Sequence, residues 1–162
     1  TCTVNVNIGK SFLAQISPKE RTIVYIKSIL QWLNDTTFNI IVIENSGYKF
    51  EELYAETEKY KDRFEIITFN ENTHEKSQYL KNNNSKGDSE LFSINYAFNN
   101  SKLIHSSNFI IKVTGRYFIP TLEDYLLEFN LNEYECLTQN NRDRCEMVGC
   151  HYTHFLNIFN NK

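Results

Sequence analysis

Apolar runs and amphipathic stretches alternate along the chain in the order strand, helix, strand, helix, strand. Residues 2–8 alternate between apolar and polar positions as a strand does, and the apolar runs 38–43 and 64–69 have the length and β-branched content of buried strands. Between these strands, residues 17–33 and 50–61 follow helical patterns. This order predicts an α/β, Rossmann-like fold with a mostly parallel sheet, right-handed crossovers and flanking helices.

Residues typical of helix caps and tight turns mark the ends of these elements. Ser17 suits the capping position of the first helix, Pro18 suits its first turn, and Glu20 lies three residues after the cap. The polar residues 34–37 end that helix, and residues 44–47 (Glu-Asn-Ser-Gly) suit a turn from a strand into the next helix.

The second half of the chain continues the pattern after a polar interruption. Residues 70–84 are rich in Asn, Lys and Glu and lack an apolar period, so they are predicted to form a mobile loop. A helical pattern over residues 88–101 then leads into a strand-like run within residues 108–120. The remaining expected elements are short, namely a helix at 121–129, a strand at 135–138 and a helical piece at 154–159.

Size, charge and cysteine usage restrict the class of protein. A chain of 162 residues is long enough for one domain with its own core. Its net charge of -3, with both signs mixed, argues against nucleic acid or an anionic membrane as the main partner. Four cysteines without Cys-x-x-Cys spacing favour reduced thiols, and no apolar stretch has transmembrane length. We therefore expect a soluble, cytoplasmic protein, although a first residue other than Met leaves room for an anchor or a further domain outside this sequence.

The strand-like run within residues 108–120 carries the most informative chemistry. Lys112, Thr114 and Arg116 alternate onto one face of this run, and Gly115 lies where the strand gives way to a loop. Open α/β sheets bind ligands at the carboxyl ends of their strands. Two cations and a hydroxyl at such an end predict a phosphate-bearing small molecule as the ligand.

Three segments, in their order and spacing, resemble the GT-A nucleotide-sugar glycosyltransferases. Residues 25–47 look like the first helix of that family and its following strand, which ends in an acidic residue and a Ser-bearing turn. Residues 86–98 are similar to the helix before the metal-binding strand, and residues 109–120 take the place of that strand. The last segment also resembles the KITGRY stretch of certain capsule-type and viral glycosyltransferase-like proteins.

The resemblance spans roughly residues 3–125 and implies a single GT-A-like domain over residues 1–162. It places nucleotide binding in about residues 1–125 and a short acceptor-side part in about 126–162. The implied activity is transfer of a sugar from a nucleotide-diphosphate sugar, such as a uridine diphosphate sugar, to a glycan or other hydroxyl acceptor. Nucleic acid is not an expected partner.

The chain departs from the family where a metal is usually held. Most of these enzymes carry an Asp-x-Asp motif that binds Mn²⁺ or Mg²⁺ against the donor diphosphate, whereas this chain has Thr114-Gly115-Arg116. Metal dependence therefore stays open. Arg116 offers a permanent cation with bidentate hydrogen bonds to phosphate, and Lys112 a second charge, so both are candidate catalytic residues. Alternatively, Lys112 extends from an edge strand to solvent and Arg116 pairs with a surface carboxylate such as Glu123 or Asp124.

Further donor-binding candidates come from the other segments. By the resemblance, Glu44 accepts a hydrogen bond from the base of the donor, while the structural alternative is that Glu44 and Ser46 cap the next turn. Lys86 and Gly87 precede a helix whose first amides are suited to a phosphate, although Lys86 can equally be solvated. Asn7 and Ile8, at the end of the first predicted strand, together with Thr114 and Gly115, complete the predicted donor site.

The second half contains the candidates for a general base and for a metal ligand. A base requires a carboxylate or imidazole near the acceptor hydroxyl, and the candidates are Asp143, Glu146, His151 and His154. Asp143 lies in the polar stretch 140–144, which suits an acceptor cleft or an ordinary surface loop. His154 is a weaker alternative as a metal ligand, and the group Cys145, Cys150, His151 and His154 fits no common zinc module.

The sequence leaves one other function open and disfavours a further one. The first is a binding module or degenerate scaffold of the same fold without catalysis, which the loss of Asp-x-Asp favours. The second is a nucleotidyltransferase that builds activated sugars, which the single Gly in residues 7–11 disfavours because such enzymes carry a Gly-rich phosphate loop.

Overall fold

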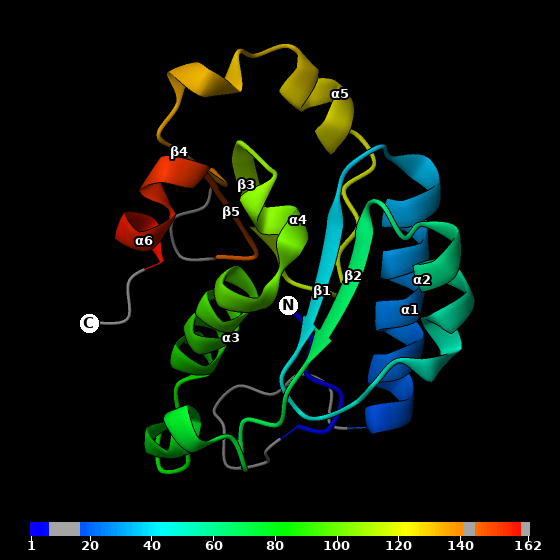
Figure 1. The fold of residues 1–162 in the computed structure, drawn as a ribbon, viewed down its shortest axis with the longest axis vertical. Coiled ribbons are helices and arrows are strands. Elements are labelled where there is room, and N and C mark those ends of the chain that lie inside the picture. Colours follow the sequence, from blue (N-terminus) through cyan, green and yellow to red (C-terminus); the bar gives the residue numbers. More distant parts are fainter. Residues whose placement is uncertain (7–16, 141–144, 160–162) are drawn as a thin grey trace.

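The computed structural model describes residues 1–6, 17–140 and 145–159, and it has a mixed α/β architecture (Figure 1). Short 3-10 helices at Glu51–Leu53, Glu75–Leu80, Leu131–Glu133 and Tyr152–His154 connect the main elements. In chain order these elements are α1 (Pro18–Asp35), β1 (Ile40–Glu44), α2 (Tyr54–Lys59), β2 (Phe64–Thr68), α3 (Lys86–Asn100), α4 (Lys102–His105), β3 (Phe109–Val113), α5 (Leu122–Leu127), β4 (Cys136–Thr138), β5 (Met147–His151) and α6 (Phe155–Ile158).

The strands form two small sheets. β1 and β2 pair in parallel, with Ile40 opposite Phe64, and β5 lies between β3 and β4 with antiparallel pairing on both sides. The expected α/β class is confirmed, but the expected mostly parallel sheet is not seen in the named strands. The reason is that β3 takes as its partner the later strand β5, which the sequence pattern did not predict.

A two-residue segment at the start of the chain joins the two sheets. The Cys2 amide donates to the Ile43 carbonyl (2.8 Å) and the Cys2 carbonyl accepts from the Asn45 amide (3.3 Å), which forms a parallel bridge to β1. The Thr1 nitrogen donates to the Val113 carbonyl (2.9 Å), and the Thr1 carbonyl accepts from the Gly115 amide (2.8 Å). Thr1 and Cys2 therefore lie between β1 and the end of β3.

The strand expected at residues 2–8 is reduced to this bridge. Val4 and Asn5 form a bend, and residues 7 and 8 lie outside the described residues. Side chains hold the bend, because the Val4 amide donates to a Glu44 carboxylate oxygen (3.0 Å) and the Asn5 amide donates to Ser46 Oγ (2.9 Å). These contacts take the place of a strand ladder beyond Cys2.

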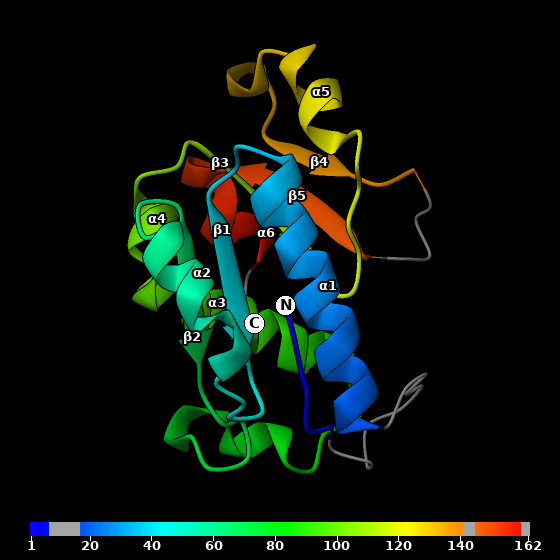
Figure 2. The ribbon, with the colours of Figure 1, turned by 90° about the vertical axis from the view of Figure 1, so that its right-hand side faces the viewer.

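Helices cover the two faces of the β1–β2 sheet (Figures 1 and 2). Tyr25, Ile29 and Leu33 of α1 pack with Val42 and Phe64. One face of this helix therefore packs on the sheet as predicted, but it is centred on Tyr25 and Ile29, and Ile23, which the apolar pattern placed on that face, is 58% exposed. The predicted start of α1 is also found, because Ser17 Oγ accepts from the Glu20 amide (3.4 Å). On the opposite face, α3 and α4 contribute Phe92, Ala97 and Ile104 to a cluster around Ile43 and Phe69.

The segment predicted as a mobile loop has structure of its own. Residues 75–80 form a 3-10 helix in which Ser77 and Leu80 are buried. Ser77 Oγ donates to the Glu71 carbonyl (2.6 Å), which ties this helix to the end of β2. None of the helices within the described ranges has both the length and the apolar character needed to span a bilayer.

Gly115→Ala is expected to destabilise the fold at the joint between the sheets. A Cβ at this position would lie 2.4 Å from Cys2 Sγ and 2.6 Å from the Thr1 carbonyl oxygen, which is backbone and cannot move freely. We expect a loss of about 1–3 kcal/mol in the free energy of unfolding, measured by urea titration. Gly87→Ala is the matched control, since its Cβ would meet only Ser85 Oγ at 3.5 Å. Equal stability of the two variants would contradict this account of the joint.

Candidate functional site

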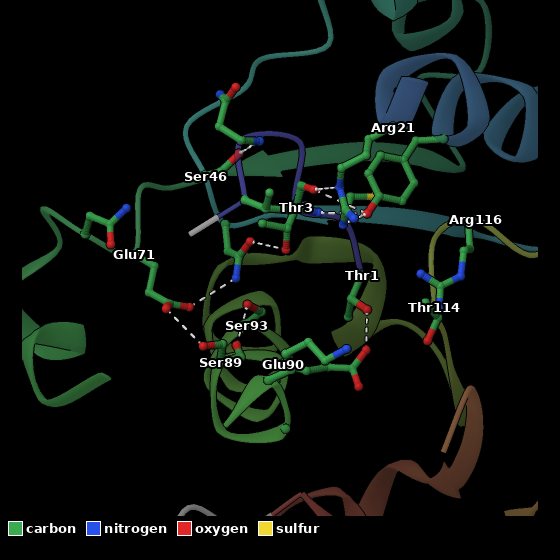
Figure 3. Close-up of a pocket in the computed structure, with 18 residues that line it drawn as sticks. Thr1, Thr3, Arg21, Ser46, Glu71, Ser89, Glu90, Ser93, Thr114 and Arg116 are labelled. Atoms are coloured by element: carbon green, nitrogen blue, oxygen red, sulfur yellow. Dashed lines mark hydrogen bonds between the residues drawn. The ribbon is translucent and has the colours of Figure 1, made fainter. Parts of the chain in front are cut away.

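A polar cavity of about 230 Å³ lies at the carboxyl ends of β1, β2 and β3. Its walls come from the segments after these strands, from the start of α1, from the start of α3 and from the first residues of the chain (Figure 3). The residues that line it are Thr1, Cys2, Thr3, Asn5, Val6, Arg21, Tyr25, Asn45, Ser46, Glu71, Asn72, Lys86, Gly87, Ser89, Glu90, Ser93, Thr114 and Arg116.

One wall of the cavity is the segment after β3, which carries Thr114 and Arg116 (Figure 3). The next residue, Tyr117, fixes this segment, because its carbonyl accepts from Ser28 Oγ (2.8 Å) and from the Trp32 indole nitrogen (2.9 Å) of α1. The guanidinium of Arg116 lies 5.0 Å from the centre of the Tyr117 ring. An exposed cation is thus held at the cavity by an aromatic face and an anchored backbone.

The alternative partner predicted for Arg116 is engaged elsewhere. Glu123 accepts hydrogen bonds from the Thr37 amide (2.9 Å and 3.1 Å) and hydroxyl. Within the described residues, no ion pair to Arg116 is found. The guanidinium therefore keeps hydrogen-bonding capacity that a ligand in the cavity can use.

The start of α3 forms a second wall. Lys86 and Gly87 are its first residues, and Ser89 and Ser93 follow on the side that faces the cavity (Figure 3). Ser85 caps the helix by accepting from the Asp88 amide (3.2 Å). Because α3 has 15 residues, its N-terminal end carries the partial positive charge of a full helix dipole.

Arg21 is a buried cation of the cavity that the sequence reasoning missed. It is 8% exposed, its Nε donates to the Thr3 carbonyl (2.5 Å), and a terminal guanidinium nitrogen donates to the Tyr25 hydroxyl. Burial raises the pKa of Tyr25, so this phenol stays neutral. A signal was available, since Arg21 lies four residues before Tyr25 on the apolar side of a predicted helix.

Two carboxylates also line the cavity, and neither was predicted. Glu71 is buried, and its two oxygens accept from Ser89 Oγ (2.9 Å) and Asn45 Nδ2 (3.1 Å). Glu90 accepts from the Thr1 hydroxyl (2.5 Å) and pairs with Lys112 Nζ (2.9 Å). Both carboxylates hold the walls together, and the cationic side chains that line the cavity are those of Arg21, Lys86 and Arg116.

Lys112 is not brought to the predicted phosphate site. Its side chain is buried, pairs with Glu90 and donates to the Cys145 carbonyl, and it does not line the polar cavity. A buried lysine requires such partners, because desolvation of an unpaired ammonium is costly. The structure thus assigns Lys112 to an internal ion pair, which differs from both roles considered for it.

Glu44 also has a structural role in the described residues. It is fully buried, and its carboxylate accepts from the amides of Val4 (3.0 Å), Ser46 (3.0 Å) and Tyr48 (2.8 Å) and from the Ser46 hydroxyl. This is the turn-capping alternative, and Glu44 is not among the residues that line the cavity. Burial raises its pKa above the ordinary range. Ser46, by contrast, does line the cavity.

The remaining candidates fall outside the cavity or outside the described residues. The candidates that lie outside the described residues are Asn7, Ile8 and Asp143. Gly115 packs against Thr1 and Cys2 below the cavity wall, and His154 caps α6, with its ring 6.4 Å from that of His151. Of the predicted donor-site residues, the structure brings together Ser46, Lys86, Gly87, Thr114 and Arg116.

The residues of this cavity do not fit the divalent cation that the resemblance implies. Mn²⁺ and Mg²⁺ require several oxygen ligands, and here Thr114-Gly115-Arg116 places a guanidinium where a carboxylate pair is needed. Residues 1–6, 17–140 and 145–159 contain no group of three His, Cys, Asp or Glu side chains that could hold a metal ion. We therefore derive no chemical step through a metal.

Comparisons of the chain with protein-family models, with curated proteins and with solved structures find no significant match.

Lys112→Met is expected to weaken the fold by about 1.5–3 kcal/mol, the range for hydrogen bonds to charged groups. The substitution keeps the apolar stem but leaves Glu90 and the Cys145 carbonyl without their buried donor. Chemical denaturation measures the change, and Lys27→Met on the exposed side of α1 is the control, expected within about 0.5 kcal/mol of the native protein. A neutral Lys112→Met would refute the structural role of this ion pair.

Glu44→Gln tests the protonation state of the buried carboxyl. Because burial raises the pKa of Glu44 above its ordinary value of 4.5, its contribution to stability is complete below that pH and is lost as the pH rises through the raised pKa. The stability advantage of the native protein over Glu44→Gln should therefore shrink as the pH rises from 4.5 toward neutrality in urea titrations. An advantage that grows with pH would mean that the amide donors hold Glu44 as a carboxylate.

Proposed function

We propose that this protein is a glycosyltransferase that binds a nucleotide-diphosphate sugar in the polar cavity and transfers the sugar to a glycan or other hydroxyl acceptor. The observation that carries the proposal is that two segments line one cavity. The segment after β3 contributes Thr114 and Arg116, and the start of α3 contributes Lys86 and Gly87. Cationic side chains and the amides of a helix start are the groups that proteins use to bind phosphate.

The topology supports a ligand at this place. From Thr1–Cys2 the chain passes through α1 to β1 and through α2 to β2 on one side, and then through α3 to β3 on the other side of Thr1–Cys2. The direction of winding therefore reverses between the Thr1–Cys2 segment and β3. In open α/β sheets, ligands bind outside the carboxyl ends of the strands at such a reversal, and the cavity lies there.

The chemistry of sugar transfer matches the groups available. When the bond between the sugar and the diphosphate breaks, negative charge grows on the leaving phosphate, and a cation fixed beside it stabilises the transition state. Arg116 would supply this charge from its guanidinium group, which can also form two hydrogen bonds to phosphate oxygens. A cavity of about 230 Å³ is smaller than most complete ligand sites, so the proposal places in it the diphosphate and not the whole donor.

A second candidate function, a binding module without catalysis, is favoured by one observation. The two carboxylates of the described cavity, Glu71 and Glu90, are both engaged with the protein itself, and a general base needs a free lone pair near the acceptor. Such a module would bind the same diphosphate group with the same residues and would release no product.

The Arg116→Ala variant is expected to bind uridine diphosphate about 10- to 100-fold more weakly than the native protein, since it loses charge-assisted hydrogen bonds of about 1.5–3 kcal/mol. Isothermal titration with uridine diphosphate and with pyrophosphate, each with and without Mn²⁺, measures the effect. Lys102→Ala removes a charge from the exposed start of α4 and should leave affinity unchanged. Native protein that binds neither nucleotide nor pyrophosphate would exclude both candidate functions.

Product release separates the two candidates. The protein is incubated with uridine diphosphate sugars and a panel of glycan acceptors, and free uridine diphosphate and extended acceptor are followed by mass spectrometry. A glycosyltransferase gives both products in equal amounts, and Arg116→Ala should lower their rate. Tight binding of uridine diphosphate without either product would leave the binding module as the function.

A further inference from the structure

A second cavity, of about 460 Å³, lies between β1 and β3 and is mainly apolar. Ile29 and Trp32 of α1 form one side of this groove. Side chains of α3, α4 and α6 form the other side, namely Ile94, Ala97, Ile104 and Phe155. Thr1 and Cys2 close one end of the groove, where they bridge the two strands.

The edge of β1 that faces this groove has backbone groups directed into it. In a parallel strand, alternate residues direct both the N–H and the C=O toward the same neighbour. The Ile40 amide and the Glu44 carbonyl bond on the β2 side, so Ile41 and Ile43 are directed to the groove side. On that side, the Cys2 amide donates a hydrogen bond to the Ile43 carbonyl.

The edge of β3 is directed into the groove in the same way. The Thr114 amide donates to the Glu146 carbonyl, on the side of β5, so the residues that alternate with Thr114 face the other way. These are Ile111 and Val113. The Thr1 nitrogen donates a hydrogen bond to the Val113 carbonyl on this side. Two strand edges therefore face each other across an apolar space, and Thr1–Cys2 bridges them in parallel at one end.

We propose that the groove binds an extended strand, which lies between β1 and β3 and runs parallel to both. Polypeptide leading into Thr1 supplies this strand. Continuity of pairing gives its register. The residue directly before Thr1 would accept from the Ile43 amide and donate to the Ile41 carbonyl. The residue before that would accept from the Val113 amide and donate to the Ile111 carbonyl.

The surroundings define the chemistry of the strand. Because α1 covers one side of the groove and α3, α4 and α6 the other, both faces of the strand meet apolar side chains. Strands buried on both faces are runs of Val, Ile and Leu and do not alternate with polar residues. Since β1 and β3 have five residues each, a run of about four or five such residues would pair with both edges.

Docking of this strand would give hydrogen-bond partners to backbone groups of β1 and β3 that are directed into the groove. An amide or carbonyl group in an apolar groove destabilises the folded state unless it has a hydrogen-bond partner. A strand in the proposed register supplies these partners on both edges and buries the apolar walls at the same time. With it in place, the two small sheets become one continuous sheet in the order β2, β1, the new strand, β3, β5 and β4.

The test compares two forms of the 162-residue chain, each with five added residues before Thr1. One addition is Lys-Ile-Val-Ile-Val, and the matched control is Lys-Ile-Val-Ile-Pro, which removes the N–H that would donate to the Ile41 carbonyl but stays apolar. Amide hydrogen exchange by nuclear magnetic resonance is read at Ile43 and Val113. The Ile40 amide, already bonded to the Arg63 carbonyl (2.7 Å), is the internal reference.

We expect exchange at Ile43 and Val113 to slow by roughly tenfold or more with the all-aliphatic addition, together with a higher melting temperature, and to slow less with the Pro control. The Ile40 amide should change only in proportion to the gain in global stability. Equal exchange at Ile43 and Val113 in both forms would overturn the proposal. The peptide Lys-Ile-Val-Ile-Val is also added as a separate molecule to the chain without an addition. If this separate peptide protects Ile43 and Val113 and the joined addition does not, the strand does not come from polypeptide leading into Thr1. Nucleotide titrations are separate from this readout, so the proposed function can fail independently.

Discussion

The backbone pairing of Thr1 and Cys2 is the constraint on which the rest of the structure depends. These two residues bond to β1 on one side and to the end of β3 on the other, and they are the described link between the parallel and the antiparallel sheet. Because they hold the carboxyl ends of β1 and β3 at a fixed spacing, the segments that follow these strands meet around one cavity. The close approach of Gly115 to this pair leaves no room for a side chain there.

The cations of β3 and of the segment after it show how burial divides structural from functional charge. Lys112 lies within the strand, where desolvation would be too costly without Glu90 and the Cys145 carbonyl as partners. Arg116 lies beyond the strand end, exposed and supported by Tyr117, so it stays charged without an internal counter-ion. A phosphate binding site requires the second kind of cation, because a neutralised charge offers a ligand little net attraction.

Elements with a local signature were predictable from the sequence, and elements set by distant partners were not. The cap at Ser17 and the apolar runs of β1 and β2 depend on nearby residues, and these elements lie close to where the sequence places them. By contrast, β5 was missed and β3 was expected in a parallel sheet, because their pairing joins segments far apart in the chain. The same limit applies to the site. The Ser46 and Tyr48 donors to Glu44 are local and agree with the turn-capping alternative, but the Val4 amide, 40 positions away in the chain, is brought to Glu44 only by the fold.

The apolar groove and the polar cavity share the residues Thr1 and Cys2, and this couples them physically. A strand in the groove that orders Thr1 would also fix the hydrogen bond from the Thr1 hydroxyl to Glu90 in the cavity wall. It would thereby set the position of the start of α3 relative to Arg116. A strand in the groove would therefore reduce the ordering that a ligand must supply on binding. By linkage, a ligand in the cavity must favour the docked strand to the same extent. If both proposals hold, completion of the sheet and binding at its rim are linked equilibria.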